Sequence, residues 1–425
     1  MLRTLVSDMF GNGWKTLEQY NKIMSILDKI KRLGSRRHDN RHPAKTMSFN
    51  KLYKGLMKRV DAGHINVQRS EDLEIFSYSK SCTFDGAWDK FTTMARGLIL
   101  CPKKKKITGL CFPKFWNYGE VSTKLPDLGF RAFTKYDGSL GICYYHRDRW
   151  RVATRGSFQS DQAVWATDYL NKHASLSNMD PNITYLTEII APWNKIVISY
   201  SFSGLVLLSG YYLNSGVELT RNEVLTETTA VGFTKSKEEN YASLDDMLAM
   251  AKVLDISNEG FVVRFYNGYR IKIKCSEYCR VHKLISNCTP LAIWDMMRNR
   301  DCLDTVRAEY PEEFHKDFDQ IIALLQKEFD DRLKDIKDFY EDTKILSAKE
   351  LGLKLKSGFS CRSVVARKFV FACRNKNFLT EVHETPDGRS KHARKTLFET
   401  FRPTGNVLKG FKQSSAMDRF SEESL

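Results

Sequence analysis

The sequence predicts an α+β protein in which a region of antiparallel β-sheet precedes a mostly α-helical C-terminal region. Between residues 73 and 107, short apolar runs alternate with turn residues, a pattern typical of antiparallel strands. Further along, Asn267-Gly268 separates two runs of apolar and basic residues, and this dipeptide favours a tight hairpin turn. From residue 289 onwards, apolar residues recur at helical spacing.

Individual elements follow from the same patterns. We expect an amphipathic N-terminal helix over residues 15–33, followed by a basic loop over 35–45 that either contacts RNA or is a solvated linker. Strands are predicted at 150–157, 183–190, 205–213, 259–265 and 269–274, and helices at 161–170 and 243–254. One long helical stripe is formed by Phe314, Phe318, Ile322, Leu325, Phe329, Leu333, Ile336 and Tyr340. These patterns divide the chain into three parts, residues 1–45, 46–286 and 287–425.

The overall charge points to an anionic partner. The chain has 425 residues, 42% of them hydrophobic, and a formal net charge of +16. A basic protein of this size favours nucleic acid or an anionic membrane surface. Its longest apolar stretch, residues 204–213, is far shorter than the roughly 18 residues that span a bilayer, so we expect no membrane partner. The sequence carries no signal for an oligomeric state.

Cysteine usage indicates the compartment. The ten cysteines are scattered and show neither Cys-x-x-Cys pairs nor zinc-type Cys/His spacing. Cys275 and Cys279 are the nearest pair, and a structural role is favoured over a metal site because no second pair lies close to them. We therefore expect reduced thiols and a cytoplasmic protein, located in the host cytoplasm if the source is viral.

The segment from Phe133 to Gly141 contains a lysine beside a carboxylate and two glycines, between apolar runs. A lysine amine attacks phosphorus only when it is neutral, so it needs apolar surroundings and nearby cations that lower its pKa from about 10.4. We interpret Lys135 as such a covalent nucleophile. The Lys-x-Asp-Gly pattern alone is a weak signal, and an ordinary hairpin turn is the competing interpretation.

Other charged residues stand in apolar segments on both sides of Lys135. Arg96 enters an apolar strand, where it either snorkels to the surface or binds an anion. Lys114 lies among aromatic residues, a mixture that suits a nucleotide or an RNA strand but also aromatic core packing with an exposed lysine. Glu188 falls in an apolar strand, where a carboxylate needs an ion-pair partner or hydroxyl groups.

Basic and apolar residues alternate between residues 270 and 274, so the predicted strand has one basic face. Arg270, Lys272 and Lys274 share one side of the predicted strand, and Ile271 and Ile273 share the other. On an exposed surface such a face is ordinary. If it lines a cleft with Lys135, it binds phosphates and lowers the pKa of the nucleophile, and the nearby Glu259 can hold a divalent cation.

In this order the segments resemble the covalent nucleotidyltransferases, the superfamily of ATP-dependent DNA and RNA ligases and mRNA capping enzymes, and most of all the bacteriophage T4 RNA ligase 1 family. The resemblance spans roughly residues 90–285. It rests on Arg96-Gly97, Lys114-Phe115, Lys135-Tyr136-Asp137-Gly138-Ser139-Leu140, Arg155-Gly156-Ser157, Glu188 with Ala191-Pro192 and Asn194, Glu259-Gly260, and Lys272-Ile273-Lys274. Two positions depart from the family: Tyr136 replaces a common acidic residue, and Arg155 replaces the usual lysine.

The resemblance implies an ATP-dependent RNA ligase that acts through lysyl-AMP and adenylated RNA. It implies an antiparallel-sheet nucleotidyltransferase (ATP-grasp-like ligase) domain at 46–286 and a basic, helical, RNA-binding domain at 287–425. ATP and Mg²⁺ are the implied cofactors, with Mn²⁺ as a substitute. The implied catalytic residues are Lys135, Lys272 and Lys274; those that bind the cofactor are Arg96, Lys114, Thr134, Arg155, Glu188 and Glu259, the last through the metal.

The expected partner is RNA, as single-stranded or broken-loop ends and including tRNA. A DNA ligase or capping enzyme is less favoured because no barrel domain is predicted after Lys274. Two alternatives stay open: a tRNA-splicing or repair ligase with special end requirements, and a catalytically idle basic RNA-binding protein. Residues 351–380 hold seven cations and no acid, with phenylalanines between them, so this segment either contacts RNA or is a solvated face.

Overall fold

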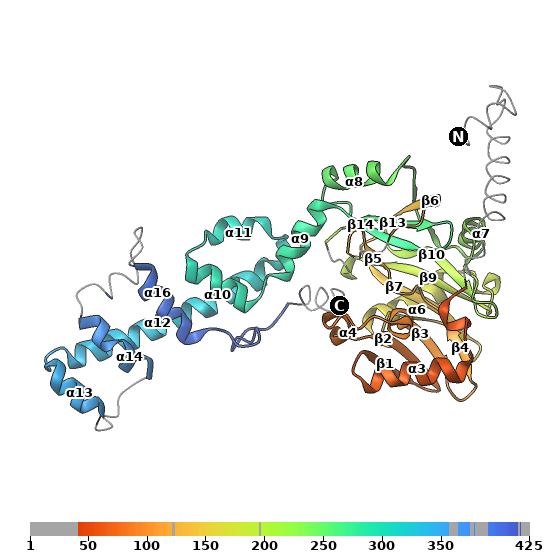
Figure 1. Ribbon diagram of the computed structural model, residues 1–425. Coiled ribbons are helices and arrows are strands. Elements are labelled where there is room, and N and C mark those ends of the chain that lie inside the picture. The colour runs from red at the N-terminus through yellow and green to blue at the C-terminus, as the bar shows by residue number, and fades with distance from the viewer. Residues whose placement is uncertain are drawn as a thin grey trace. The chain divides into compact units, whose positions relative to one another are not determined.

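The computed structural model describes residues 41–120, 124–194, 197–356, 364–374, 378, 390–414 and 417 (Figure 1). The helix predicted for residues 15–33 and most of the basic loop predicted after it lie outside these residues. The chain divides into two compact units. Unit 1 comprises Met1–Ile189, Ser203–Leu248 and Gly260–Ile273; unit 2 comprises Ile190–Phe202, Ala249–Glu259 and Lys274–Leu425.

The first sheet of unit 1 is antiparallel throughout, as the pattern over residues 73–107 predicts. Its strands, in spatial order, are β1 (Ile65–Ser70), β2 (Leu73–Tyr78), β3 (Arg96–Cys101) and β4 (Lys106–Gly109). Helix α3 (Phe49–Asp61) packs on this sheet and buries Leu52 and Leu56. Two short helices that the sequence analysis missed, α4 (Lys80–Phe84) and α5 (Lys90–Met94), follow β2 and begin at side-chain caps from Ser79 and Asp89.

The second sheet has five strands, drawn yellow to green in Figure 1. Its spatial order is β11 (Thr234–Lys235), β10 (Gly204–Tyr212), β9 (Ile183–Ile190), β7 (Ser139–His146) and β8 (Arg149–Ala153). Helices α6 (Asp161–His173) and α7 (Arg221–Val231) pack against it. The predicted strand at 183–190 is confirmed. The strand predicted for 150–157 is wrong beyond Ala153, because the amide of Thr154 donates to the carbonyl of Ser157 and turns the chain.

The third sheet also has five strands. Its spatial order is β12 (Glu238–Glu239), β6 (Phe130–Thr134), β13 (Gly260–Phe265), β14 (Arg270–Lys274) and β5 (Trp116–Asn117). The predicted hairpin between β13 and β14 is confirmed, and Gly268 takes the left-handed conformation (φ 86°) that its turn requires. Strand β14 alternates as predicted, with Ile271 and Ile273 buried.

Unit 2 is rich in helices from residue 276 onwards. These are α9 (Ser276–Ser286), α10 (Pro290–Asn299), α11 (Leu303–Glu309), α12 (His315–Thr343), α13 (Ala348–Lys356), α14 (Val364–Arg374) and α16 (Ser390–Phe398), with the short turns η4 (Glu312–Phe314) and η5 (Glu399–Phe401). Helix α12 packs against α10 and α14. Its predicted apolar stripe is confirmed with two corrections: Ile321 and Phe339 are the buried residues, whereas Ile322 and Tyr340 are half-buried.

Helix α8 (Leu244–Val253) confirms the helix predicted for residues 243–254. Every cysteine in the described part of the chain is a free thiol. No described helix combines the length and the apolar character that crossing a membrane demands.

Candidate active site

Lys135 lies on the link between two sheets. Strand β6 of the third sheet ends at Thr134, and strand β7 of the second sheet begins at Ser139. The amide of Lys135 donates to the carbonyl of Gly260 over 2.9 Å, so the pairing of β6 with β13 continues as far as the lysine. Asp137 is buried two residues later. The hairpin-turn interpretation is therefore wrong, because β6 and β7 do not pair with each other.

Glu188 lies close to the start of β7. In the antiparallel register of β7 and β9, Ser139 is opposite Ile189 and Leu140 is opposite Glu188. Glu188 is half-buried, whereas the residues on either side of it, Thr187 and Ile189, are fully buried. This register places Glu188 at the end of the second sheet that receives the chain from Lys135.

Three of the predicted phosphate-binding cations surround one tyrosine, Tyr78, at the end of β2. The Nζ atom of Lys114 lies 5.6 Å from the centre of the Tyr78 ring, and the Cζ atom of Arg155 lies 5.0 Å from it. Burial alone favours the neutral phenol, but the charges of Arg96, Arg155 and Lys114 together hold the pKa of Tyr78 below its usual value. The phenol therefore lies in a strongly positive environment.

A second ring, Phe115, connects Arg96 to Lys272. The Cζ atom of Arg96 lies 5.6 Å from the centre of this ring, and the Nζ atom of Lys272 lies 5.4 Å from it. Four cations that the sequence analysis singled out are thus gathered around two aromatic rings. We call Arg96, Lys114, Arg155 and Lys272 the cation cluster.

Arg96 carries a donor that lacks an acceptor. Its Nη1 atom is buried and has no hydrogen-bond partner among the described residues. A buried donor left without a partner costs about 1–3 kcal/mol, so this position is suited to an anionic ligand that accepts the hydrogen bond. Arg96 as a whole is half-buried, but the burial of its Nη1 atom favours anion binding over the snorkelling alternative.

A glycine brings two motif segments into close contact. Gly97 has a φ of 93°, and a Cβ atom there would lie 2.2 Å from Cδ1 of Ile142 and 3.4 Å from the carbonyl oxygen of Arg155. A side chain at this position would therefore separate the Arg96 strand from the Arg155 segment. The close approach of these two segments thus explains why a glycine follows Arg96 in the sequence.

Two predicted site residues of unit 2 contact each other. Glu259 is 3% exposed, and its Oε1 atom lies 3.4 Å from Nζ of Lys274. The Lys274 ammonium also lies 5.2 Å from the centre of the Tyr278 ring. Glu259 supplies one carboxylate, which suits Mg²⁺ when substrate phosphates provide the other oxygen ligands.

The hydroxyl group of Thr134, predicted to bind the cofactor, donates to Oε1 of Glu239 over 2.6 Å.

Arg270 shares a strand face with Lys272 but has a different environment. It forms a buried ion pair with Glu218, which also accepts from Arg264. Burial would raise the pKa of Glu218, but the charges of Arg270 and Arg264 lower it to about 2.

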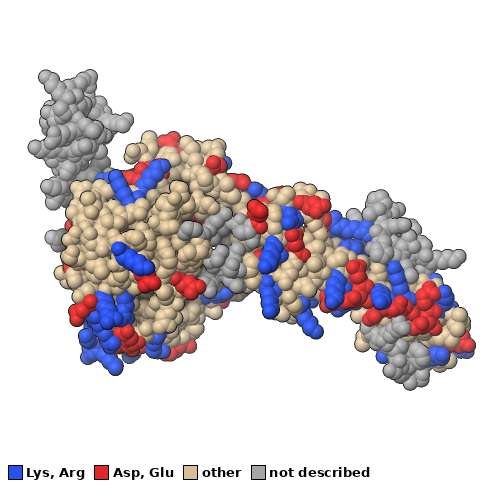
Figure 2. Space-filling model, turned by 180° about the vertical axis from the view of Figure 1, so that it is seen from behind, with Lys and Arg blue, Asp and Glu red and all other residues tan. Residues whose placement is uncertain are grey.

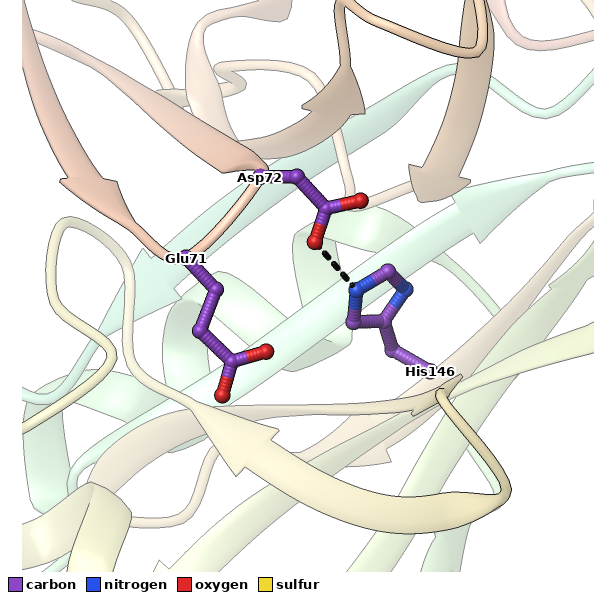
Figure 3. A group of neighbouring side chains, drawn as sticks. All are labelled: Glu71, Asp72 and His146. Carbon is purple, nitrogen blue, oxygen red and sulfur yellow. Dashed lines mark hydrogen bonds and ion pairs between the residues drawn. The ribbon is translucent and has the colours of Figure 1, made fainter.

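Glu71, Asp72 and His146 form a separate cluster in unit 1 (Figure 3). Its residue types suit a metal ion, but both acids already have cationic partners. Arg147 contacts both Glu71 and Asp72, at 2.9 and 2.8 Å, and Arg151 contacts Glu71 at 3.0 Å. The hydrogen bond with His146 lowers the pKa of Asp72 to about 2. We interpret this cluster as a structural connection between the β1–β2 and β7–β8 turns.

The sequence analysis missed Tyr78 and Trp88. The Trp88 ring lies 5.2 Å from Nζ of Lys114 and 5.0 Å from the Tyr78 ring. Trp88 follows Asp85 and Gly86, but nothing in that segment marks the ring as part of a site, and both residues reach the cation cluster only through tertiary packing.

Comparison with known proteins supports the family assignment. Residues 94–278 match the RNA ligase family model of the T4 RNA ligase 1 type. A protein of Autographa californica nuclear polyhedrosis virus, named as a bifunctional polynucleotide kinase/RNA ligase, is 26% identical over 220 residues, which cover 44% of this chain and 30% of the viral protein. The RNA ligase of Rhodothermus phage RM378 is 22% identical over 306 residues, 53% of this chain and 67% of the phage protein. The chain therefore spans less than a third of the length of the first relative.

Solved structures give weaker likenesses. An ATP-dependent DNA ligase assigned to Aquifex aeolicus is 14% identical with a TM-score of 0.43, covering 76% of this chain and 88% of the ligase. A variant of the Naegleria gruberi RNA ligase with ATP and Mn is 17% identical with a TM-score of 0.30, covering 36% of this chain and 52% of the ligase. Likenesses of this extent do not identify a fold by themselves. The match to the RNA ligase family model does not depend on them, and its range, residues 94–278, includes Lys135 and every member of the cation cluster.

Proposed function

We propose that the chain is an ATP-dependent RNA ligase that joins 5′-phosphate and 3′-hydroxyl RNA ends. The observation that carries the proposal is the cation cluster, in which Arg96 has a buried donor without an acceptor in the described part of the chain. Such an arrangement binds the phosphates of a nucleotide substrate. The proposal includes a nucleotidyltransferase fold for residues 46–286.

In the first step, the neutral Nζ of Lys135 attacks the α-phosphorus of ATP. The new N–P bond forms as the bond to the bridging oxygen breaks, pyrophosphate leaves, and the lysine loses a proton. In the second step, a 5′-phosphate oxygen of RNA displaces Lys135 and takes the AMP. In the third, a 3′-hydroxyl attacks that 5′-phosphorus, AMP leaves, and a phosphodiester bond is formed.

The other residues position charge for these steps. Arg96, Lys114, Arg155 and Lys272 bind phosphates, and Arg155 can do so as a two-pronged donor, which a lysine cannot. Glu188 binds ribose hydroxyls, since its place near the start of β7 puts it close to the Lys135 segment in the fold. We assign Glu259 to Mg²⁺ or Mn²⁺, which when bound stabilises negative charge on the phosphates. Lys274 and Thr134 complete the proposed set.

The C-terminal region, residues 287–425, is proposed to bind RNA. On α14, Arg367 and Lys368 are exposed, while Phe369 and Val370 are buried. The Phe369 and Phe378 rings contact each other at 5.4 Å, so these phenylalanines serve packing rather than RNA contact. Arg362 and Phe359 lie outside the described residues. The free thiols of the chain are compatible with the reducing cytoplasm, which is where we place its activity.

The decisive experiment is covalent labelling. The protein is incubated in parallel with labelled ATP, GTP and NAD, and ATP alone is expected to label it. Labelling by none of the three would support the alternative of a catalytically idle RNA-binding protein. The tRNA-splicing alternative is tested on the same preparation, by comparing RNA with ordinary 5′-phosphate and 3′-hydroxyl ends against RNA with a modified junction phosphate.

A further inference from the structure

Aromatic rings extend from the cation cluster toward the solvent in unit 1. The Trp88 ring lies 5.2 Å from Nζ of Lys114, and the Trp116 ring lies 6.1 Å from the Trp88 ring in an edge-to-face arrangement. Both tryptophans are half-buried. The rings thus continue directly from residues that we propose to bind phosphate.

Strand β5 leads from Trp116 to a more exposed ring. It pairs in parallel with β14, with Asn117 opposite Lys272. The amide of Tyr118 then donates to the carbonyl of Lys272 over 2.7 Å. This bond fixes Tyr118 beside a member of the cation cluster, and the residue is 45% exposed.

Phe84 is a further exposed ring that is near Trp88 in the chain. It is the last residue of α4 and is 93% exposed. Full burial of such a side chain is worth about 1.5–3 kcal/mol, a stabilisation that the folded chain does not obtain here. Phe84 stands four positions before Trp88 in the sequence, so their Cα atoms are at most about 15 Å apart. The turn between them is held by a bond of 3.0 Å from the amide of Ala87 to the carbonyl of Cys82.

We propose that Phe84, Trp88, Trp116 and Tyr118 form a stacking surface for the bases of single-stranded RNA, next to the site where the cation cluster binds its phosphates. This inference rests on the proposed function and adds to it the part of the chain that holds the RNA strand. Each base has a π-face, and stacking on an aromatic side chain is worth about 1–3 kcal/mol per base. The neighbouring cations make RNA the matching partner, because one strand offers both phosphates and unstacked bases.

The test uses Phe84 and Tyr118, which can be replaced without opening the core. Binding of a fluorescent, 5′-phosphorylated single-stranded RNA is measured by anisotropy over a range of salt concentrations. Phe84→Ala should weaken binding by about 5- to 160-fold, the equivalent of one stacked base. The salt dependence should stay unchanged, because no phosphate contact is removed. Lysyl-AMP formation from ATP should also stay unchanged.

A graded series separates stacking from general apolar contact. Phe84→Tyr should bind as the wild type does, whereas Phe84→Leu should bind as weakly as Phe84→Ala. Tyr118→Ala should show a similar loss and Tyr118→Phe none. The matched control is Val164→Ala, because Val164 is a half-exposed apolar residue of α6 in the same unit. Duplex RNA, whose bases are already stacked, should bind to all variants equally.

Several results would overturn the inference. They are unchanged RNA affinity of the Phe84 and Tyr118 variants, full binding by Phe84→Leu, or an equal loss for duplex RNA. Failure of the proposed ligase activity gives a different result. In that case ATP does not label the wild-type protein, while the aromatic series still ranks RNA affinity. If ATP labels every variant and all bind RNA equally, the ligase proposal stands and the stacking surface is rejected.

Discussion

Two cations of the candidate site in unit 1 and several arginines on the helix surfaces of unit 2 have different partners. In unit 2, arginines pair with carboxylates on helix surfaces: Arg280 with Glu277 and Glu309, and Arg307 with Asp319. On the face drawn in Figure 2, blue and red atoms accordingly alternate along the helical unit. Exposed pairs of this kind contribute about 0–1 kcal/mol each.

In unit 1, Arg96 and Lys114 lie over aromatic rings. Among the described residues, no carboxylate lies within ion-pair distance of either side chain. A cation that already has an acidic partner must give it up to bind a phosphate, whereas one supported by aromatic rings is ready to do so. Residue counts alone do not reveal this difference, because both units are rich in basic residues.

The largest expected effect concerns Lys135. Lys135→Ala should abolish covalent labelling by ATP and ligation of 5′-phosphate RNA, yet still seal pre-adenylated RNA, because only the first two steps use the amine. Labelling is followed on denaturing gels. Lys235→Ala, at an exposed lysine of β11, is the control and should label normally. Persistent labelling of Lys135→Ala would sink the assignment.

Substitution of Glu218 tests how much stability comes from cations of unit 1 that pair with a carboxylate. Glu218→Gln leaves the half-buried Arg264 and the more deeply buried Arg270 without a counter-charge and should lower the free energy of unfolding by about 3–5 kcal/mol. The folded pKa of Glu218 is about 2, below the ordinary carboxyl value. Its stabilisation is therefore complete above the ordinary value and is lost as pH falls toward 2.

Denaturant unfolding of the wild type and Glu218→Gln at neutral and acidic pH checks both points. The two proteins should differ most near neutrality and converge as the pH is lowered. A difference that grows on acidification would contradict the ion-pair account.

Substitutions of Lys272 and Lys274 test whether the cations that lie near aromatic rings contribute to lysyl-AMP formation. We expect Lys272→Ala to slow lysyl-AMP formation by about 10²–10³, the range for removal of one charge-stabilising donor. Lys274→Ala should slow it as well. Arg280→Ala, in an exposed pair of unit 2, should leave the rate within about twofold and serves as the control. If Lys274→Ala forms lysyl-AMP at the wild-type rate, its ammonium serves only the ion pair with Glu259.

The smallest effect is expected in the C-terminal region. Replacing Arg362, Arg367 and Lys368 together with glutamine should spare lysyl-AMP formation and impair the two RNA-dependent steps. Each lost phosphate contact should reduce the salt slope of RNA binding by about 0.7 to 0.9. Equal loss of all three steps would mean that the segment only supports folding, and unchanged RNA affinity would mean that it is a solvated face.

Truncation after Asp342 is a less clean version of this experiment. It removes α14 and α16, and with them the Phe398 ring that lies 5.2 Å from Phe329 of α12. The buried stripe of α12 would then be exposed, so loss of RNA binding would not separate contact from misfolding.

Features that depend on the order of neighbouring residues could be predicted from the sequence. The family match spans the charged motifs around Lys135, and the alternation of β14 and most of the α12 stripe are confirmed. The stripe shifted to Ile321 and Phe339 because 3.6 residues per turn lets several neighbouring positions share one face. The helices α4 and α5 were missed because they are only five residues long, shorter than periodicity can identify.

The pairing of charges could not be predicted, since it depends on contacts between residues far apart in the sequence. Arg270 and Lys272 share a strand face, yet one meets Glu218 and the other lies over Phe115. Likewise, the ring of Tyr78 contacts members of the cation cluster only when β2 packs beside the segments that carry Lys114 and Arg155.

The position of Lys135 between two sheets has a consequence for folding. The candidate site uses Tyr78 and Arg96 of the first sheet, Glu188 of the second and Lys272 of the third, and the Lys135 link joins the last two. Contacts between residues so distant along the chain form slowly and require large loops to close. During refolding, lysyl-AMP formation should therefore return only after all three sheets have formed, which makes the labelling reaction a late kinetic marker of the complete unit.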